Sequence, residues 1–186
     1  MLIFICSTVL YAQLSDSKKL ILSEGTYFIE SIEDANGLPG VRAMFEIDGT
    51  KEEVWQMIND FENFKQIYGG NVDSLKVHRH DEKGAIVEFW SDAVIRKIHF
   101  TLERKFLNSN TKLTWEKISG DLKIIKGGWE LVDSYDKKKT ILIYRTFIKF
   151  GGIVPTKLLR AGAKRKAKDM IRDTRDWISE NRYLYQ

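Results

Sequence analysis

Apolar and polar positions alternate along the middle of the chain, in short runs that turn residues separate. Alternation with a period of two is typical of a β-strand with one buried face. The separating segments are short, as at 108–110 and 119–121, so successive strands are expected to pair antiparallel as a meander. The predicted strands cover residues 72–80, 85–90, 95–107, 112–118, 122–132 and 140–150.

A capped helix is predicted just before this meander. Thr50 is a good N-cap residue, and Glu53 three positions later completes a capping box. The helix is expected to end near Asp60, and residues 64–68 to form a short second helix or turn. The apolar positions with helical spacing are Val54, Trp55, Ile58 and Phe61.

Two further strands are expected ahead of the capped helix. Residues 21–33 contain β-branched and aromatic residues with partial alternation, and residues 41–47 form a second apolar run. The segment 36–40, NGLPG, has turn chemistry, because glycine allows positive φ and proline fixes its own φ. Together these segments indicate a hairpin.

The carboxyl-terminal part of the chain predicts one long helix over residues 155–182. Pro155 is tolerated in a first helical turn, and nothing after it stops a helix. Steps of three and four place several residues on one stripe, so this helix is expected to pack one face on an apolar surface. The stripe consists of Leu159, Ala163, Ala167, Met170, Thr174, Trp177 and Ile178.

The first residues are an uncharged apolar run. Residues 2–12 suit the apolar core of a secretory signal peptide, and a buried first strand is the alternative. Cys6 is the only cysteine, so the chain cannot form an internal disulfide. We expect an exported protein, periplasmic or secreted, with a signal peptide at 1–12, a strand extension at 13–40 and one domain at 41–182.

Composition places the chain among ordinary globular domains. It has 186 residues, 43% of them hydrophobic and 12% aromatic, which is enough for one substantial core. The formal net charge is +4, with both signs mixed along most of the chain. This mixture does not favour a nucleic-acid partner, and it leaves the oligomeric state open.

No residue pattern predicts a catalytic centre, a metal or a cofactor. His78 and His80 are two apart on a predicted strand and should face the same way, but with His99 they lack the ligand spacing of a metal site. The chain contains no Gly-x-Ser-x-Gly motif, and its glycine pairs match neither a P-loop nor a dinucleotide fingerprint.

Three stretches of the chain, together with the order of its elements, resemble the START-like superfamily. The stretches are IDGTKEEVWQMINDFENFKQIYGG at 47–70, GGWEL at 127–131 and VPTKLLRAGAKRKAKDMIRDTRDWI at 154–178. The resemblance covers about residues 41–178 and is nearest to coenzyme Q-binding and polyketide cyclase-like domains. It implies an α+β, helix-grip fold, in which a curved antiparallel sheet wraps around a long C-terminal helix, with two short helices after the first core strand.

The resemblance also implies a cavity between sheet and helix for a lipid, quinone or polyketide-like ligand. A core filled by side chains is the alternative, and Arg145, like Arg96, would lie in solvent if its strand faced the other way. If the protein were instead a cyclase- or dehydrase-type enzyme, Tyr144 and Arg145 would be the first candidates. The residues expected to line the cavity are Phe89, Phe100, Trp115, Trp129, Tyr144, Arg145, Leu159, Ala163 and Met170.

One stretch departs from the mixed charge pattern. The first half of the last predicted helix contains only basic charges before Asp169. It is either the solvated face of an amphipathic helix or a patch that contacts anionic membrane lipids. The patch consists of Lys157, Arg160, Lys164, Arg165 and Lys168, with Lys166 among them.

Three hypotheses follow: a carrier of a hydrophobic ligand, a cyclase- or dehydrase-type enzyme, and a protein-interaction module without ligand. Cell fractionation separates the third from the first, because we expect the carrier to be exported. Recovery of the full chain in the cytoplasm would contradict export and favour the interaction module.

Overall fold

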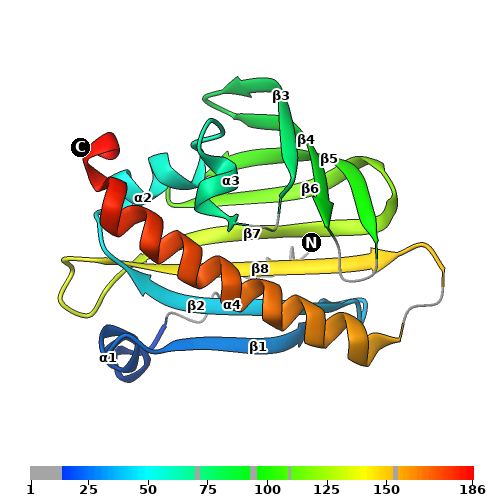
Figure 1. Cartoon of the computed structure of the whole chain (residues 1–186). Coiled ribbons are helices and arrows are strands. Elements are labelled where there is room, and N and C mark those ends of the chain that lie inside the picture. Colours follow the sequence, from blue (N-terminus) through cyan, green and yellow to red (C-terminus); the bar gives the residue numbers. More distant parts are fainter. Residues whose placement is uncertain (1–13, 70–71, 93–95, 109, 153–154) are drawn as a thin grey trace, which may run out of the picture.

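The protein folds around one curved, eight-stranded antiparallel sheet (Figure 1). The structure, a computed structural model, describes residues 14–69, 72–92, 96–108, 110–152 and 155–186. The strand order across the sheet is β1-β2-β8-β7-β6-β5-β4-β3. The strands are β1 (Tyr27–Glu33), β2 (Pro39–Ile47), β3 (Ser74–Asp81), β4 (Gly84–Asp92), β5 (Lys97–Leu107), β6 (Lys112–Gly120), β7 (Leu122–Asp133) and β8 (Thr140–Phe150).

This order follows from a meander that returns to its starting point. After β2 the chain crosses to the far edge of the sheet and comes back strand by strand from β3 to β8. The last strand then pairs with β2, with Ala43 opposite Tyr144. The predicted α+β helix-grip fold, its antiparallel meander and the hairpin of β1 and β2 are confirmed.

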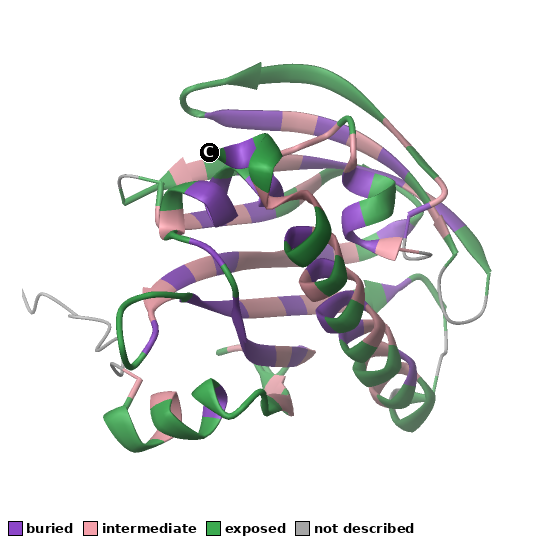
Figure 2. Cartoon of the chain, turned by 60° about the vertical axis from the view of Figure 1, so that its left-hand side comes forward, coloured by how far each residue is buried: buried purple, intermediate pink, exposed green. Residues whose placement is uncertain are grey.

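Helix α1 covers part of the outer face of the sheet, and the other helices pack on its concave side. The longest, α4, crosses the concave face, and the sheet bends around it (Figure 2). The short helices predicted after the first core strand are α2 and α3, which lie between β2 and β3. The helices are α1 (Asp16–Ser23), α2 (Lys51–Ile58), α3 (Phe64–Ile67), α4 (Thr156–Asn181) and the 3₁₀ turn η2 (Arg182–Tyr185).

The predicted capping box begins α2. The backbone N–H of Glu53 donates to Thr50 Oγ1 at 3.3 Å, and the Thr50 N–H donates to Glu53 Oε2 at 2.7 Å. The same carboxylate forms an ion pair with Arg182 at 2.8 Å. The cap therefore also ties the beginning of α2 to the end of the chain.

The main core lies between the concave face of the sheet and the helices that cover it. The predicted inward set of β5, Ile98, Phe100 and Leu102, is buried, and Leu113 and Trp115 share the same face on β6. On α4 the expected stripe faces the sheet. Its buried members are Ala167, Met170, Thr174 and Ile178, and its half-buried members are Leu159, Ala163 and Trp177.

A smaller apolar cluster lies on the outer face of the sheet, and it corrects one prediction. Residues 21–33 were expected to be strand, but α1 ends at Ser23 and β1 begins at Tyr27. Leu22 of α1 is buried against Met44, Ile141 and Ile143, which the convex face would otherwise expose. The helix forms because covering this patch outweighs the local preference for strand.

The predicted signal peptide at 1–12 and Cys6 lie outside the described residues. In the part of the chain that the structure describes, no helix has the length and apolar character needed to cross a membrane.

Two glycines give a matched test of how tightly the sheet packs against the ring of Trp115. A Cβ at Gly127 would meet the Arg145 carbonyl oxygen and lie 2.6 Å from the Trp115 ring, whereas a Cβ at Gly151 would meet nothing within 4 Å. We expect Gly127→Ala to lower the free energy of unfolding by about 1–3 kcal/mol, because overpacking forces backbone or ring shifts. Gly151→Ala should change it by less than about 0.5 kcal/mol. Urea denaturation measures both. Equal effects of the two substitutions would contradict tight packing around Gly127.

Candidate ligand cavity

A cavity of about 260 Å³ lies between the concave face of the sheet and α4. Its walls come from β2, β4 to β8, α3 and the first half of α4. Most of the lining side chains are apolar or aromatic, as is typical of sites for hydrophobic ligands. The core is therefore not completely filled by side chains, which was the alternative left open by the sequence.

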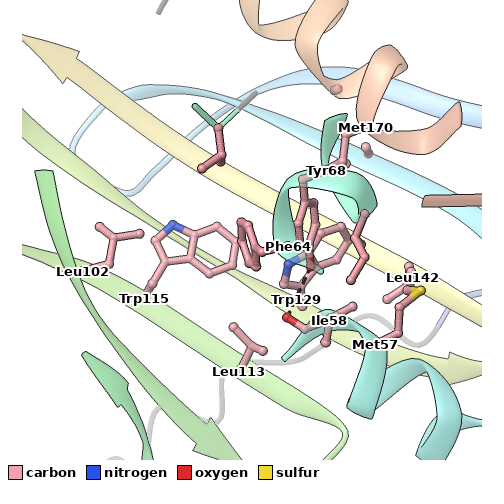
Figure 3. Close-up of a cluster of buried hydrophobic side chains, with 14 of the residues drawn as sticks. Met57, Ile58, Phe64, Tyr68, Leu102, Leu113, Trp115, Trp129, Leu142 and Met170 are labelled. Carbon is pink, nitrogen blue, oxygen red and sulfur yellow. Dashed lines mark hydrogen bonds between the residues drawn. The ribbon is translucent and has the colours of Figure 1, made fainter. Parts of the chain in front are cut away.

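Aromatic rings form the sheet side of the cavity (Figure 3). Tyr144 lies between the two tryptophans, with ring centroids 5.6 Å from Trp115 and 4.8 Å from Trp129. Phe89 stacks on Phe100 at 5.5 Å. These rings come from five neighbouring strands, so one continuous aromatic surface faces the helix.

The helix side of the cavity is formed by α4. Leu159, Ala163 and Met170 line it, as the sequence predicted, together with the buried Ala167. The two alanines are small, which leaves room beneath this part of the helix. Eight of the nine residues expected to line a cavity do so, and ligand contact by these residues stays a prediction.

Arg145 is the exception, and its expected place in the cavity was wrong. Side chains alternate along a strand, so the inward position of Tyr144 on β8 places Arg145 on the outer face. There its guanidinium forms an ion pair with Glu130 at 3.2 Å. Arg96 is also exposed, so both arginines follow the alternative in which they face solvent.

The cavity instead contains an arginine that the sequence reasoning missed. Arg104 continues the inward set of β5 and is only 4% exposed. Its Nη2 donates to the Ile58 carbonyl oxygen at 3.0 Å, and the guanidinium lies over the Phe61 ring at 5.0 Å. The alternation that predicted Leu102 inward would have found Arg104 two residues later.

The charge of Arg104 has no carboxylate partner among the described residues. Its Nη1 is buried without a hydrogen-bond acceptor, and no ion pair involves this side chain in the described chain. Burial lowers the pKa of Arg104 to about 10, which still leaves it charged at neutral pH. An unpaired cation in an apolar cavity is costly unless a ligand or water supplies an acceptor.

Two tyrosines supply the other polar groups near this end of the cavity. Tyr68 donates from its hydroxyl to the Ile58 carbonyl oxygen at 3.3 Å, the bond between these residues in Figure 3. Burial raises the pKa of both Tyr68 and Tyr144, so both phenols stay protonated. They can therefore donate hydrogen bonds but cannot act as bases at neutral pH.

The histidines do not form a metal site in the described chain. A bulge between Val77 and Arg79 places His78 and His80 on opposite faces of β3, which corrects the expectation that they face the same way. His78 and His99 both contact Glu88, at 2.7 and 2.6 Å, whereas His80 packs on Phe61. The described residues include no group of three or more His, Cys, Asp or Glu suited to a metal.

The basic patch predicted on the last helix divides into two parts. Lys157, Lys164, Arg165 and Lys168 are exposed on the outer side of α4. Arg160 instead reaches the rim of the cavity and forms an ion pair with Glu33 at 2.8 Å. The expectation that Arg160 belongs to the outward patch is therefore corrected.

A curved sheet that encloses a mainly apolar cavity with a long helix is the arrangement of helix-grip proteins. Within this class, the chain belongs to the polyketide cyclase/dehydrase and lipid transport family, whose model matches residues 47–175. The resemblance to START-like proteins noted from sequence is confirmed. No curated protein sequence matches the chain.

Several solved structures have the same fold at low sequence identity. A START superfamily protein from Mycobacterium smegmatis has a TM-score of 0.67 at 12% identity, covering 76% of this chain and 97% of its own. The Zhui aromatase/cyclase from Streptomyces sp. R1128 has a TM-score of 0.65 at 11% identity, covering 76% and 93%. Human StAR-related lipid transfer protein 5 has a TM-score of 0.62 at 10% identity, covering 89% and 93%.

A volume-conserving substitution tests whether Arg104 is an unpaired buried charge. We expect Arg104→Met to keep or raise the free energy of unfolding of the ligand-free protein, by about 0–3 kcal/mol, because apolar replacement removes the desolvation cost. Arg145→Met, which breaks a half-exposed ion pair, should lower it by no more than about 1 kcal/mol. Denaturant unfolding of delipidated protein measures both. A loss of more than about 3 kcal/mol in Arg104→Met would show that this charge is already satisfied.

Proposed function

We propose that this protein binds and carries a hydrophobic small molecule whose head is anionic or accepts hydrogen bonds. The observation that carries the proposal is the buried guanidinium of Arg104, which lies in a mainly apolar cavity and has a buried Nη1 without a hydrogen-bond acceptor in the described chain. The ligand's apolar body would lie along the aromatic wall, and its head would accept from Arg104. The family supports hydrophobic-ligand binding of this general kind.

The size of the cavity narrows the ligand class. A volume of about 260 Å³ lies just below the usual range for drug-sized ligands, roughly 300–1,000 Å³. The lining reaches from Tyr144 to Phe150 along β8 and from Leu159 to Met170 along α4, so the space is long as well as narrow. A single-chain or small-ring amphiphile fits these limits better than a two-chain lipid.

The polarity of the cavity fixes the orientation of such a ligand. The head would lie at Arg104, near Tyr68 and the α2–α3 end of the cavity. A carboxylate there gains a charge-assisted hydrogen bond and removes the cost of an unpaired cation. An uncharged ester gains less, because it offers a weaker acceptor.

Catalysis on the bound ligand is a second candidate, supported by Tyr144. Its buried phenol faces the cavity and could donate a proton to a substrate oxygen. Asp92, at the rim, is the one carboxylate among the described lining residues. General acid–base catalysis needs a base within reach of the substrate, and Asp92 lies at the rim of the cavity. The carrier function is therefore the better supported proposal.

A carrier must also load and release its ligand. Contact with an anionic membrane is therefore part of this proposal, and we retain export of the protein as a further part of it. The wholly basic first half of α4 supports the membrane contact.

Binding of a fluorescent fatty acid tests the proposal. We expect cis-parinarate to bind the delipidated protein and to receive energy from Trp115 and Trp129, which line the cavity. Its methyl ester should bind more weakly. Arg104→Met should weaken cis-parinarate binding by roughly tenfold to a hundredfold, the contribution of a hydrogen bond to a charged group.

The matched control is Arg145→Met, whose side chain lies on the outer face and should leave affinity unchanged. Equal affinities for acid and ester in every variant would contradict the role of Arg104. No binding of either probe would contradict the carrier function, and turnover lost in Tyr144→Phe would favour the enzyme.

A further inference from the structure

Four cations on α4 form an outward basic face, defined here as Lys157, Lys164, Arg165 and Lys168. All four side chains are exposed, and none forms an ion pair with any described residue. At 3.6 residues per turn, the steps of seven and four place Lys157, Lys164 and Lys168 on one side of the helix. That side is opposite to the one by which α4 lines the cavity.

The outward basic face is unfavourable for the helix that carries it. The first turn of α4 contains no acid, and no side chain caps it, while Lys157 places a positive charge at the positive end of the helix dipole. Lys164 and Lys168 are spaced i,i+4, a like-charge arrangement that destabilises a helix. These cations therefore do not serve to stabilise α4.

The second half of the same helix shows the contrasting arrangement. Arg172 forms ion pairs with Asp169 at 3.7 Å and with Asp173, so charges there are balanced locally. Arg175 donates to three backbone carbonyl oxygens. The unbalanced charge is thus confined to the half of α4 that covers the cavity.

Apolar exposure accompanies this charge. Leu158 is 45% exposed beside Lys157, in the turns of α4 that Figure 2 shows as mostly exposed. In the same turns, Leu159, Ala163 and Ala167 line the cavity from the inner side. One short stretch of helix therefore separates the cavity from the outward basic face.

We propose that the outward basic face of α4 docks the protein on anionic phospholipid bilayers, with Leu158 entering the interface. The inference rests on the proposed carrier function for its purpose, because docking here places the cavity wall against the membrane. Each cation near an anionic bilayer strengthens binding by about fivefold, and an apolar side chain adds to this. Bilayer contact also neutralises the repulsion along the helix.

A nucleic acid is the rival occupant for any basic surface. It would use the four cations, but it would not use the exposed Leu158 or the position of this helix over an apolar cavity. The bilayer accounts for the charge, the apolar side chain and the cavity together.

Vesicle co-sedimentation tests the proposal with two charge-matched variants. The first carries K157Q, K164Q, R165Q and K168Q. The second carries K65Q, K76Q, K83Q and K138Q, which remove four exposed lysines from other elements. The probes are vesicles of phosphatidylcholine alone and of phosphatidylcholine with phosphatidylglycerol, and circular dichroism checks that both variants stay folded.

We expect the unmodified chain to bind only the anionic vesicles, the first variant to lose more than about a hundredfold in affinity, and the second to lose less than about fivefold. An equal loss in both variants would overturn the outward basic face as the docking surface. Tighter binding to a single-stranded oligonucleotide at the same salt would overturn it in favour of nucleic acid.

Binding of cis-parinarate in solution, measured on the same variants, separates the two proposals. It should be unchanged in the first variant, because the four cations do not line the cavity. Vesicle binding without parinarate binding would sustain docking and contradict the carrier function. Parinarate binding without vesicle binding would sustain the carrier function and contradict docking on the bilayer.

Discussion

The structure depends on the contacts that hold α4 across the concave face of the sheet. Its second half is held by polar bonds as well as by packing. Arg175 donates to the carbonyl oxygens of Glu46, Gly25 and Thr26, at 3.0, 3.1 and 3.3 Å. Arg182 forms an ion pair with Glu53, which joins the end of the helix to the capping box of α2. Charge-assisted hydrogen bonds of this kind hold the helix at its carboxyl-terminal end.

The first half of α4 is packed less tightly against the sheet. Its stripe residues Leu159 and Ala163 are only half-buried, and the ion pair of Arg160 with Glu33 is half-exposed. The cavity lies under this half, where small side chains on the helix meet the aromatic wall. The second half of α4 is therefore packed closely on the sheet, whereas the first half covers the cavity. The outward basic face lies on the solvent side of this first half.

Much of the fold could be predicted from the sequence, because it depends on local patterns. Two-residue alternation gave the strands, and the Thr50–Glu53 box gave the start of α2. The helix α1 could not be found this way. It exists because Leu22 covers Met44 and Ile141, which are distant in sequence and become a patch only when β2 and β8 pair. The bulge that separates His78 from His80 is likewise a property of strand pairing.

The site was predicted where side chains are apolar, and missed or misplaced where they are charged. Apolar positions such as Phe100 and Trp115 face inward by default, so alternation places them correctly. A charged residue is expected outside by default, and Arg104 breaks that expectation while Arg145 obeys it. Such violations of local rules occur at functional sites, which is why the unpaired guanidinium carries the functional argument.

The most direct test of this account is mass spectrometry of what the protein retains. The chain would be purified natively and extracted with organic solvent, beside the Arg104→Met variant. We expect a single-chain apolar carboxylate, or a comparable amphiphile whose head accepts hydrogen bonds, in the extract of the unmodified protein and not in that of the variant. A neutral molecule retained equally by both proteins would contradict it.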